Sequence, residues 1–166
     1  MKRLDTEKIL KGAAAGLIAG LAASFVMGQY QTLLSSLAEK EESPGQPEDE
    51  PATVKAAEEI SEEVFDHKLS TSEKGQAGEA MHYAMGGVSG LIYGAAAEIE
   101  PLATTGAGLP FGTAVWLVAD DLVVPALGLS KPPTEYTLST HAYALSSHLV
   151  YGLTTELVRK WLRRLL

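Results

Sequence analysis

The residues of this chain that could carry chemistry are acids and histidines set within apolar stretches. The stretches 77–99, 108–128 and 138–160 contain eight of them: Glu79, His82, Glu98, Asp120, Asp121, His141, His148 and Glu156. An ionised group in apolar surroundings must be paired, hydrogen-bonded or neutralised, because burying an isolated charge is costly. Imidazole and buried carboxyl groups also titrate near neutral pH, so the same side chains are suited to moving protons or holding ions.

Several kinds of site are compatible with these residue types. Glu79 and His82 have the E-x-x-H spacing of di-iron carboxylate bundles, but such sites need two copies and two further glutamates, and this chain has one copy. His82, His141 and an aspartate are acceptable zinc ligands without diagnostic spacing, and a haem between His82 and His141 or His148 is a further alternative. A path for protons or ions along the Asp and His side chains is a further alternative. We favour a structural interpretation, in which these groups hydrogen-bond one another across helices and fix one packing of the bundle.

The sequence shows no nucleophile beside a base that could activate it. It has no cysteine, which excludes a disulfide, a thiolate metal site and a cysteine nucleophile. Ser146 and Ser147 directly precede His148, so the three side chains point to different faces of one helix, where serine tends to bond to the helix's own carbonyls. We therefore expect no enzymatic activity, no catalytic residue and no cofactor.

The elements that must position these groups are indicated by a ladder of small residues. Small residues recur every fourth position, at Gly12, Gly16, Gly20, Ser24 and Gly28, and again at Gly86, Gly90 and Gly94. Glycine costs a water-exposed helix about 1 kcal/mol relative to alanine. It is favoured where two helix backbones approach closely in a bilayer. The ladder predicts an all-α membrane bundle whose first two apolar helices cross tightly, in the right-handed class.

Four apolar stretches cover the roughly 20 residues needed to cross the hydrocarbon core of a bilayer. They are 9–37, 77–99, 108–128 and 138–160, within a single membrane domain of 166 residues. Basic residues precede the first span and close the fourth: Lys2, Arg3, Lys8, Lys11, Arg159, Lys160, Arg163 and Arg164. The positive-inside rule then places both termini in the cytoplasm.

The stretch 39–76 between the first two spans is strongly acidic. It contains twelve acids and four lysines, and its net charge of −8 equals that of the whole chain. Residues 39–51 are too charged and proline-rich to fold alone, whereas 52–69 has apolar residues at helical spacing with acids opposite. We expect an external loop with an extra amphipathic helix, which covers the outer end of the bundle or docks an envelope partner.

Two other interpretations compete with a membrane bundle. The polarity of 138–160 favours a soluble, glycine-rich all-α protein. A cleaved signal peptide fits the basic start and the first apolar run, with Ser36, Leu37 and Ala38 before Glu39. The glycine ladder favours the membrane bundle over both.

If both termini are inside, four ionisable side chains from three helices fall in the outer half of the bilayer, with His148 near the midplane. The four are His82, Asp120, Asp121 and His141. His141 and His148 share one face of the last helix. Asp120 and Asp121 point about 100° apart, so only one is expected to aim fully at that face. Pro125 frees the carbonyl of Asp121 and should open the helix locally.

The sequence also resembles a known family. The strings GAGLPFGTAVWLVADDLVVPALGLSKPPTEY (106–136), STH (139–141) and HLVYG (148–152), with PATVKAA (51–57) and GEAMHY (78–83), are similar to the YagU-like family of small bacterial inner-membrane proteins of unknown function. The resemblance implies a multi-span protein of the bacterial inner membrane and supplies no reaction.

The sequence thus predicts a four-span membrane bundle with a helix-packing, partner-binding or envelope-support role. We expect the lipid bilayer as its surroundings, a second copy or another membrane protein as its partner, and no nucleic acid. The alternatives are a transporter or proton-responsive protein that uses the Asp and His layer, or a metal- or haem-binding bundle.

Overall fold

A computed structural model describes residues 5–38 and 50–166 of the chain. The regular elements in these two ranges are all helical: α1 (Thr6–Ala38), α2 (Ala52–Phe65), α3 (Thr71–Ile99), η1 (Pro101–Gly108), α4 (Leu109–Val115), η2 (Trp116–Val123), α5 (Val124–Ala126), η3 (Pro133–Glu135) and α6 (Leu138–Arg163). The predicted all-α class is confirmed. The predicted lack of structure over 39–51 falls mostly on 39–49, which lies outside the described residues, as do the basic residues Lys2 and Arg3.

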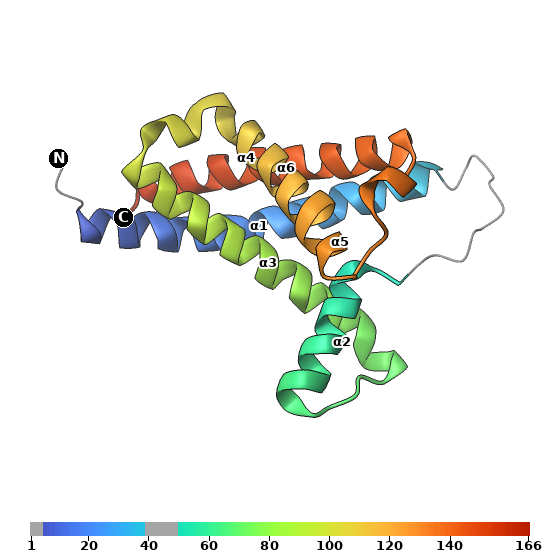
Figure 1. Cartoon of the computed structure of the whole chain (residues 1–166). Helices are drawn as coiled ribbons and strands as arrows, with labels where there is room; N and C mark the ends of the chain where they lie inside the picture. The colour runs from blue at the N-terminus through green and yellow to red at the C-terminus, as the bar shows by residue number, and fades with distance from the viewer. Residues whose placement is uncertain (1–4, 39–49) are drawn as a thin grey trace.

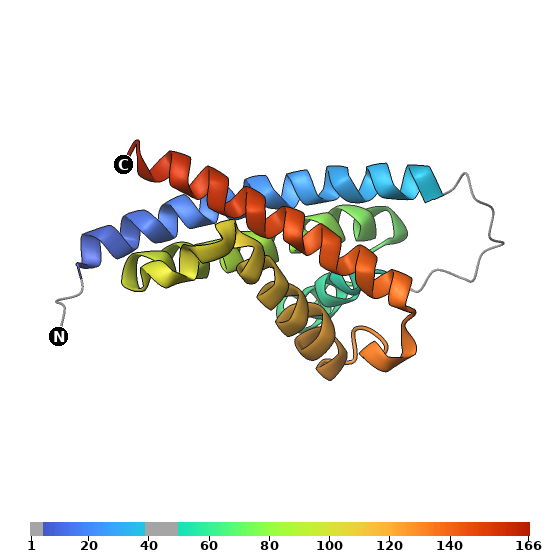
Figure 2. The same cartoon turned by 90° about the horizontal axis from the view of Figure 1, so that it is seen from above.

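Helix α1 is the central element, because it contacts both α3 and α6 along its length. Figure 1 shows α3 crossing α1 obliquely, and Figure 2 shows that α6 also crosses α1 at an angle, so α1 and α6 diverge toward the start of α6. The start of α1 and the end of α6 lie at the same end of the bundle (Figure 1). Helix α4 packs on α6, and Phe111 and Val115 of α4 cover a buried cluster of Ala23, Met27 and Tyr151.

The contact between α1 and α3 is made by glycine backbones. A Cβ atom built on Gly16 would collide with the carbonyl oxygen of Gly90 and lie 2.8 Å from the Cα of Gly94. A Cβ on Gly90 would in turn lie 2.7 Å from the Cα of Gly20. Neither helix can therefore carry a larger residue here without moving away from its partner. Gly28, by contrast, faces open space, with no atom within 4 Å of its added Cβ.

A second glycine contact joins α4 to α6. A Cβ on Gly152 would lie 2.7 Å from the nitrogen and 2.8 Å from the Cα of Gly112. Gly108 lies against the carbonyl of Gly152 and has a left-handed φ of 84°, so it provides both the close approach and the turn into α4. The sequence analysis did not predict this contact.

The third predicted span is interrupted in its middle. Trp116–Val123 form a π-helix, and the backbone N–H of Val124 donates to the carbonyl of Ala119, five residues earlier. Pro125 follows directly and cannot donate the bond expected from an α-helix. This widened segment contains Asp120 and Asp121. Its position just before Pro125 is consistent with the local opening of the helix that Pro125 predicts.

Helix α2 covers the first half of α3 at the end of the bundle away from the start of α1 (Figure 1). Val54 packs against Gly78, where an added Cβ would meet the valine side chain. Lys74 of α3 donates to Glu58 of α2 at 2.6 Å and to Glu50 at 3.0 Å. The hydrogen bond from Lys74 lowers the pKa of Glu58 below its usual range, and the bonds to Glu58 and Glu50 raise the pKa of Lys74.

Two helical stretches of the described chain are long and apolar enough to cross a membrane, Thr6–Leu37 and Pro101–Ala126. Helices α3 and α6 do not reach the same apolarity, because both contain polar and ionisable side chains inside their length. Large apolar side chains on the two apolar stretches face outward, among them Ile18, Phe25, Val118 and Leu122.

Candidate functional site

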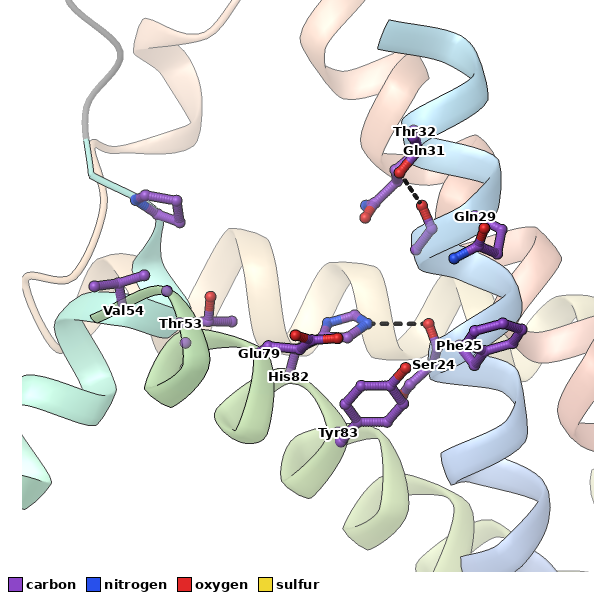
Figure 3. A pocket seen from close by; sticks show the side chains of 14 residues that line it. Ser24, Phe25, Gln29, Gln31, Thr32, Thr53, Val54, Glu79, His82 and Tyr83 are labelled. Atoms are coloured by element: carbon purple, nitrogen blue, oxygen red, sulfur yellow. Dashed lines mark hydrogen bonds between the residues drawn. The ribbon is translucent and has the colours of Figure 1, made fainter. Parts of the chain in front are cut away.

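Polar side chains from four segments meet around a cavity of about 290 Å³. Ser24 comes from α1, His82 from α3, Asp120 from η2, and His148 and Tyr151 from α6. A second cavity of about 440 Å³ adjoins it, since Ser24 and His82 line both. We refer to the first as the inner cavity and to the second, which is shown in Figure 3, as the outer cavity.

The side chains of His148 and Asp120 form the ionic part of the inner cavity. His148 Nδ1 lies 2.9 Å from the carbonyl oxygen of Ala144 and 3.6 Å from Asp120 Oδ2. A carbonyl only accepts hydrogen bonds, so Nδ1 must carry the proton. Asp120 Oδ2 approaches the same ring nitrogen from η2, so the two side chains form an aspartate–histidine pair between α6 and η2.

Hydrogen bonds at the cavity also tie the helices together. His82 Nε2 lies 3.3 Å from the carbonyl oxygen of Ser24 (Figure 3), which joins α3 to α1. The hydroxyl of Tyr151 donates to the carbonyl of Gly86 at 2.6 Å, which joins α6 to α3. Ser24 Oγ is buried and has no hydrogen-bond partner within the described residues.

Asp121 and His141 form a separate pair outside both cavities. His141 Nδ1 lies 3.9 Å from Asp121 Oδ1, and its Nε2 lies 2.9 Å from the carbonyl oxygen of Pro133. The rings of Trp116 and Tyr136 meet that imidazole edge-on, with centroids 6.0 and 6.3 Å away. The polar layer expected from the sequence is therefore divided into two aspartate–histidine pairs.

The structure corrects one detail of the sequence analysis. Only one of the two adjacent aspartates was expected to aim at the histidine face of the last helix, yet Asp120 approaches His148 and Asp121 approaches His141. The two histidines lie two turns apart on α6, so adjacent aspartates on an oblique neighbouring segment can each reach a different one. The angle of about 100° between the two aspartates assumed the step of a regular α-helix, whereas both lie in the π-helical segment.

Glu79 takes no part in these pairs. It is exposed at the rim of the outer cavity, one turn before His82 and Tyr83. It forms no hydrogen bond or ion pair with any residue that the structure describes. Within the same ranges, no three His, Asp or Glu side chains lie close enough to hold a metal ion, so the zinc site considered from the sequence is not assembled.

The most deeply buried charges lie at the other end of the bundle. The side chain of Glu156 is fully buried and accepts hydrogen bonds from Arg159 at 2.7 Å and from Tyr93 at 3.0 Å. Arg163 donates to Glu98 at 2.6 Å, which links the end of α6 to α3. Tyr93 was not predicted from the sequence, and Arg159 and Arg163 were interpreted only as indicators of membrane topology. The available signal was the i, i+3 spacing of Glu156 and Arg159, which allows the two side chains to pair on one face of the helix.

Most of the chain, including most of the inner cavity, matches a known protein family. Residues 43–157, well over half of the chain, match the family described as "Protein of unknown function (DUF1440)". The chain belongs to the DUF1440 family. The matched range includes His82, Asp120 and His148 but not α1 or Arg159, so the DUF1440 region supplies most of the inner cavity and α1 supplies its Ser24 wall. No curated protein and no solved structure matches the chain.

Proposed function

We propose that this DUF1440 protein is a non-enzymatic, four-span protein of the bacterial inner membrane, similar to the YagU-like proteins, with both termini in the cytoplasm. Its role is to support or bind a partner in the envelope, and its buried polar pairs hold the bundle in one arrangement. The proposal is supported mainly by the distribution of side chains: apolar groups face outward, while acids and bases are paired with one another inside.

The outward-facing side chains support a lipid environment. Leu117, Val118, Leu122 and Val123 are all exposed on the π-helical segment, and Ile18 and Phe25 are exposed on α1. An apolar face of this kind is suited to lipid, whereas in water it would be an aggregation hazard. Helices α3 and α6 are less apolar, but their ionisable groups are directed toward each other and toward α1 and η2, as expected of polar residues within a membrane.

The paired interior supports a structural role over a chemical one. Arg159 and Tyr93 satisfy Glu156, and Arg163 satisfies Glu98. A group whose hydrogen bonds are all used in holding helices together is poorly placed to act on a substrate. Helix α2 lies at the end away from these pairs, with Glu59, Glu62 and Glu63 exposed. This is the surface that we assign to an envelope partner or to a second copy.

The role of the polar pairs is tested by single alanine substitutions at His82, Asp120, Asp121, His141 and His148, with the free energy of unfolding measured in detergent. Interhelical hydrogen bonds in membranes contribute about 0.6 kcal/mol each, so we expect small but measurable losses. If all five variants unfold like the wild type, the packing role is wrong.

Partner binding by α2 is tested with a photo-crosslinking amino acid at Glu63, which is exposed on α2. The matched control carries the same group at Leu102, which is exposed on η1 at the other end of the bundle. We expect a discrete crosslinked species, to an envelope protein or to a second copy, from the α2 position. Crosslinks of equal yield and size from both positions would argue against a docking surface on α2.

A second candidate function is supported by the inner cavity. The pair of His148 and Asp120 borders a space of about 290 Å³, which is the arrangement expected of a proton-responsive or ion-conducting protein. Proton flux into proteoliposomes should then fall in the Asp120→Asn and His148→Ala variants. Flux equal to that of protein-free vesicles in the wild type would exclude this function.

A further inference from the structure

The ionisable groups around the inner cavity come from three helical segments, and all three can accept hydrogen bonds. Asp120 lies on η2, His148 on α6 and His82 on α3, and the described lining residues include no lysine or arginine. An ionised carboxylate only accepts hydrogen bonds, and a neutral imidazole accepts at one of its nitrogens. A ligand that satisfies these groups must therefore supply hydrogen-bond donors, and its positive charge would be balanced by Asp120.

His148 has a fixed ring with one unpartnered nitrogen. The residue is 8% exposed, and its Nδ1 donates to the carbonyl of Ala144 at 2.9 Å, so Nε2 of the neutral ring keeps its lone pair. Nε2 has no hydrogen-bond partner among the residues that the structure describes. Unlike Ser24 Oγ, it is not sealed off from the surrounding space, and the space that His148 lines is the inner cavity. A buried acceptor without a partner is uncommon, because it loses its hydration without compensation.

Asp120 provides a second, independent observation, because its carboxylate is also left without a hydrogen bond. Its Oδ2 lies 3.6 Å from His148 Nδ1, whereas a charge-assisted N–H···O bond measures about 2.7–2.9 Å. No other group in the described part of the chain donates to this carboxylate. The ion pair with His148 therefore leaves the oxygens of Asp120 able to accept hydrogen bonds from a bound molecule.

His82 adds a third acceptor and helps to identify the ligand. Its Nε2 faces the carbonyl of Ser24 at 3.3 Å (Figure 3), so Nε2 carries the proton and Nδ1 keeps a lone pair. The described acids and histidines do not gather closely enough to hold a metal ion, whose ligand atoms lie at about 2.0–2.2 Å. An N–H donor reaches its acceptors at about 2.7–3.2 Å. A primary ammonium group suits this wider arrangement, because its three N–H donors match three acceptors.

We propose that the inner cavity binds the ammonium group of a small primary alkylamine. Asp120 is the counter-ion, and His148 Nε2 and His82 Nδ1 accept hydrogen bonds from the ammonium group. Met27 and Met85 line the same cavity and provide apolar surface for the alkyl part. The site goes beyond the packing role proposed above, and it does not require that the cavity conduct protons.

The test is the binding of radiolabelled methylammonium to the full-length protein in phosphatidylglycerol nanodiscs, measured by scintillation proximity without a proton gradient. The measurement is made at about pH 8, where a primary ammonium stays protonated and free imidazole is neutral. Unlabelled methylammonium and tetramethylammonium are the competitors, since both carry the charge but only the first has N–H donors. We expect saturable binding, and tetramethylammonium should displace the label at least about tenfold less well than methylammonium.

Three variants assign the binding to the proposed residues. Asp120→Asn keeps the shape of the side chain but removes its charge, and it should weaken binding at least about tenfold. His148→Asn keeps an N–H donor near the position of Nδ1 but has no atom at Nε2, so it should weaken binding about threefold or more. Asp121→Asn is the matched control, because Asp121 is the adjacent carboxylate and pairs with His141 outside both cavities. It should bind methylammonium like the wild type.

Four results would overturn the proposal. The first is the absence of saturable methylammonium binding to the wild type, and the second is equal displacement by tetramethylammonium, which would show that only positive charge is sensed. The third is an equal loss of affinity in the Asp120→Asn and Asp121→Asn variants. The fourth is wild-type affinity in both Asp120→Asn and His148→Asn. None of these results depends on proton flux, so the amine site and the proton-responsive function can fail separately.

Discussion

Replacing Gly16 by alanine should weaken the bundle, whereas the same change at Gly28 should not. Both residues lie in α1, but the added Cβ meets different surroundings. At Gly16 it would collide with the carbonyl of Gly90 and lie 2.8 Å from the Cα and 2.9 Å from the nitrogen of Gly94. These are backbone atoms, so no side-chain rotation relieves the overlap and α1 must move away from α3. At Gly28 no atom lies within 4 Å.

The comparison between the two variants isolates the packing cost. Both substitutions gain about 1 kcal/mol of helix propensity, and this gain cancels in their difference. Overpacking of a tight contact costs about 1–3 kcal/mol. We therefore expect Gly16→Ala to unfold with a free energy about 1–3 kcal/mol lower than Gly28→Ala, and Gly28→Ala to equal or exceed the wild type.

The assay is unfolding by SDS titration in mixed detergent micelles, followed by far-ultraviolet circular dichroism. Gly20→Ala should behave like Gly16→Ala, because its added Cβ would meet the backbone of Gly86 and Gly90. Equal free energies for the Gly16 and Gly28 variants, within about 0.5 kcal/mol, would refute the close approach of α1 and α3.

Three further predictions concern pH and buried polar contacts. Because the pKa of Glu58 is lowered in the folded protein, its bond to Lys74 stabilises α2 above the ordinary pKa of 4.5 and is lost as the pH falls through the lowered value. Amide hydrogen exchange of α2, corrected for intrinsic rates, should accelerate in that acidic range. Glu58→Gln should abolish this acceleration. If the variant still shows it, the loss of α2 stability in acid does not come from the Glu58–Lys74 bond. Glu156→Gln should cost about 3 kcal/mol, because it removes the carboxylate that accepts two hydrogen bonds from the buried Arg159 and leaves only Glu98, 3.8 Å away, as a counter-charge. Wild-type stability in SDS titration would contradict this. Tyr151→Phe removes one hydrogen bond to the backbone of α3 and should cost about 0.5–1.5 kcal/mol in the same assay, and a gain in stability would show that the hydroxyl is not used.

The helices and their closest contact could be predicted from sequence because they depend on local spacing. Glycines four residues apart predicted the approach of α1 to α3, and the structure places Gly16 against Gly90 and Gly94. The contact of α4 with α6 was missed although Gly108 and Gly112 are four residues apart, because the facing helix supplies only Gly152 and has no matching repeat. Gly28 was included although it faces open space; spacing does not show where two crossing helices diverge.

The candidate site was predictable in its residue types but not in its geometry. The acids and histidines stood out as ionisable groups within apolar stretches. Their pairing, however, depends on the π-helical segment, and the spacing of apolar residues in the sequence does not reveal that segment. The cavities depend on the placement of α2 and α3 around α1, so the position of Ser24 between them could not be predicted. Burial of Glu156 likewise requires Tyr93, which only the crossing of α3 brings near.

The orientation of the chain in the membrane is the most direct test of the account, and the absence of cysteine makes it accessible. Three single-cysteine variants change exposed residues at the start of α3, before α4 and before α6: Thr71→Cys, Thr105→Cys and Thr134→Cys. A membrane-impermeant maleimide applied to spheroplasts should label the first and third, and label the second only after the membrane is permeabilised. Labelling of Thr105→Cys with protection of Thr134→Cys would show that only α1 and the α4–α5 segment cross the bilayer, and would contradict the four-span bundle.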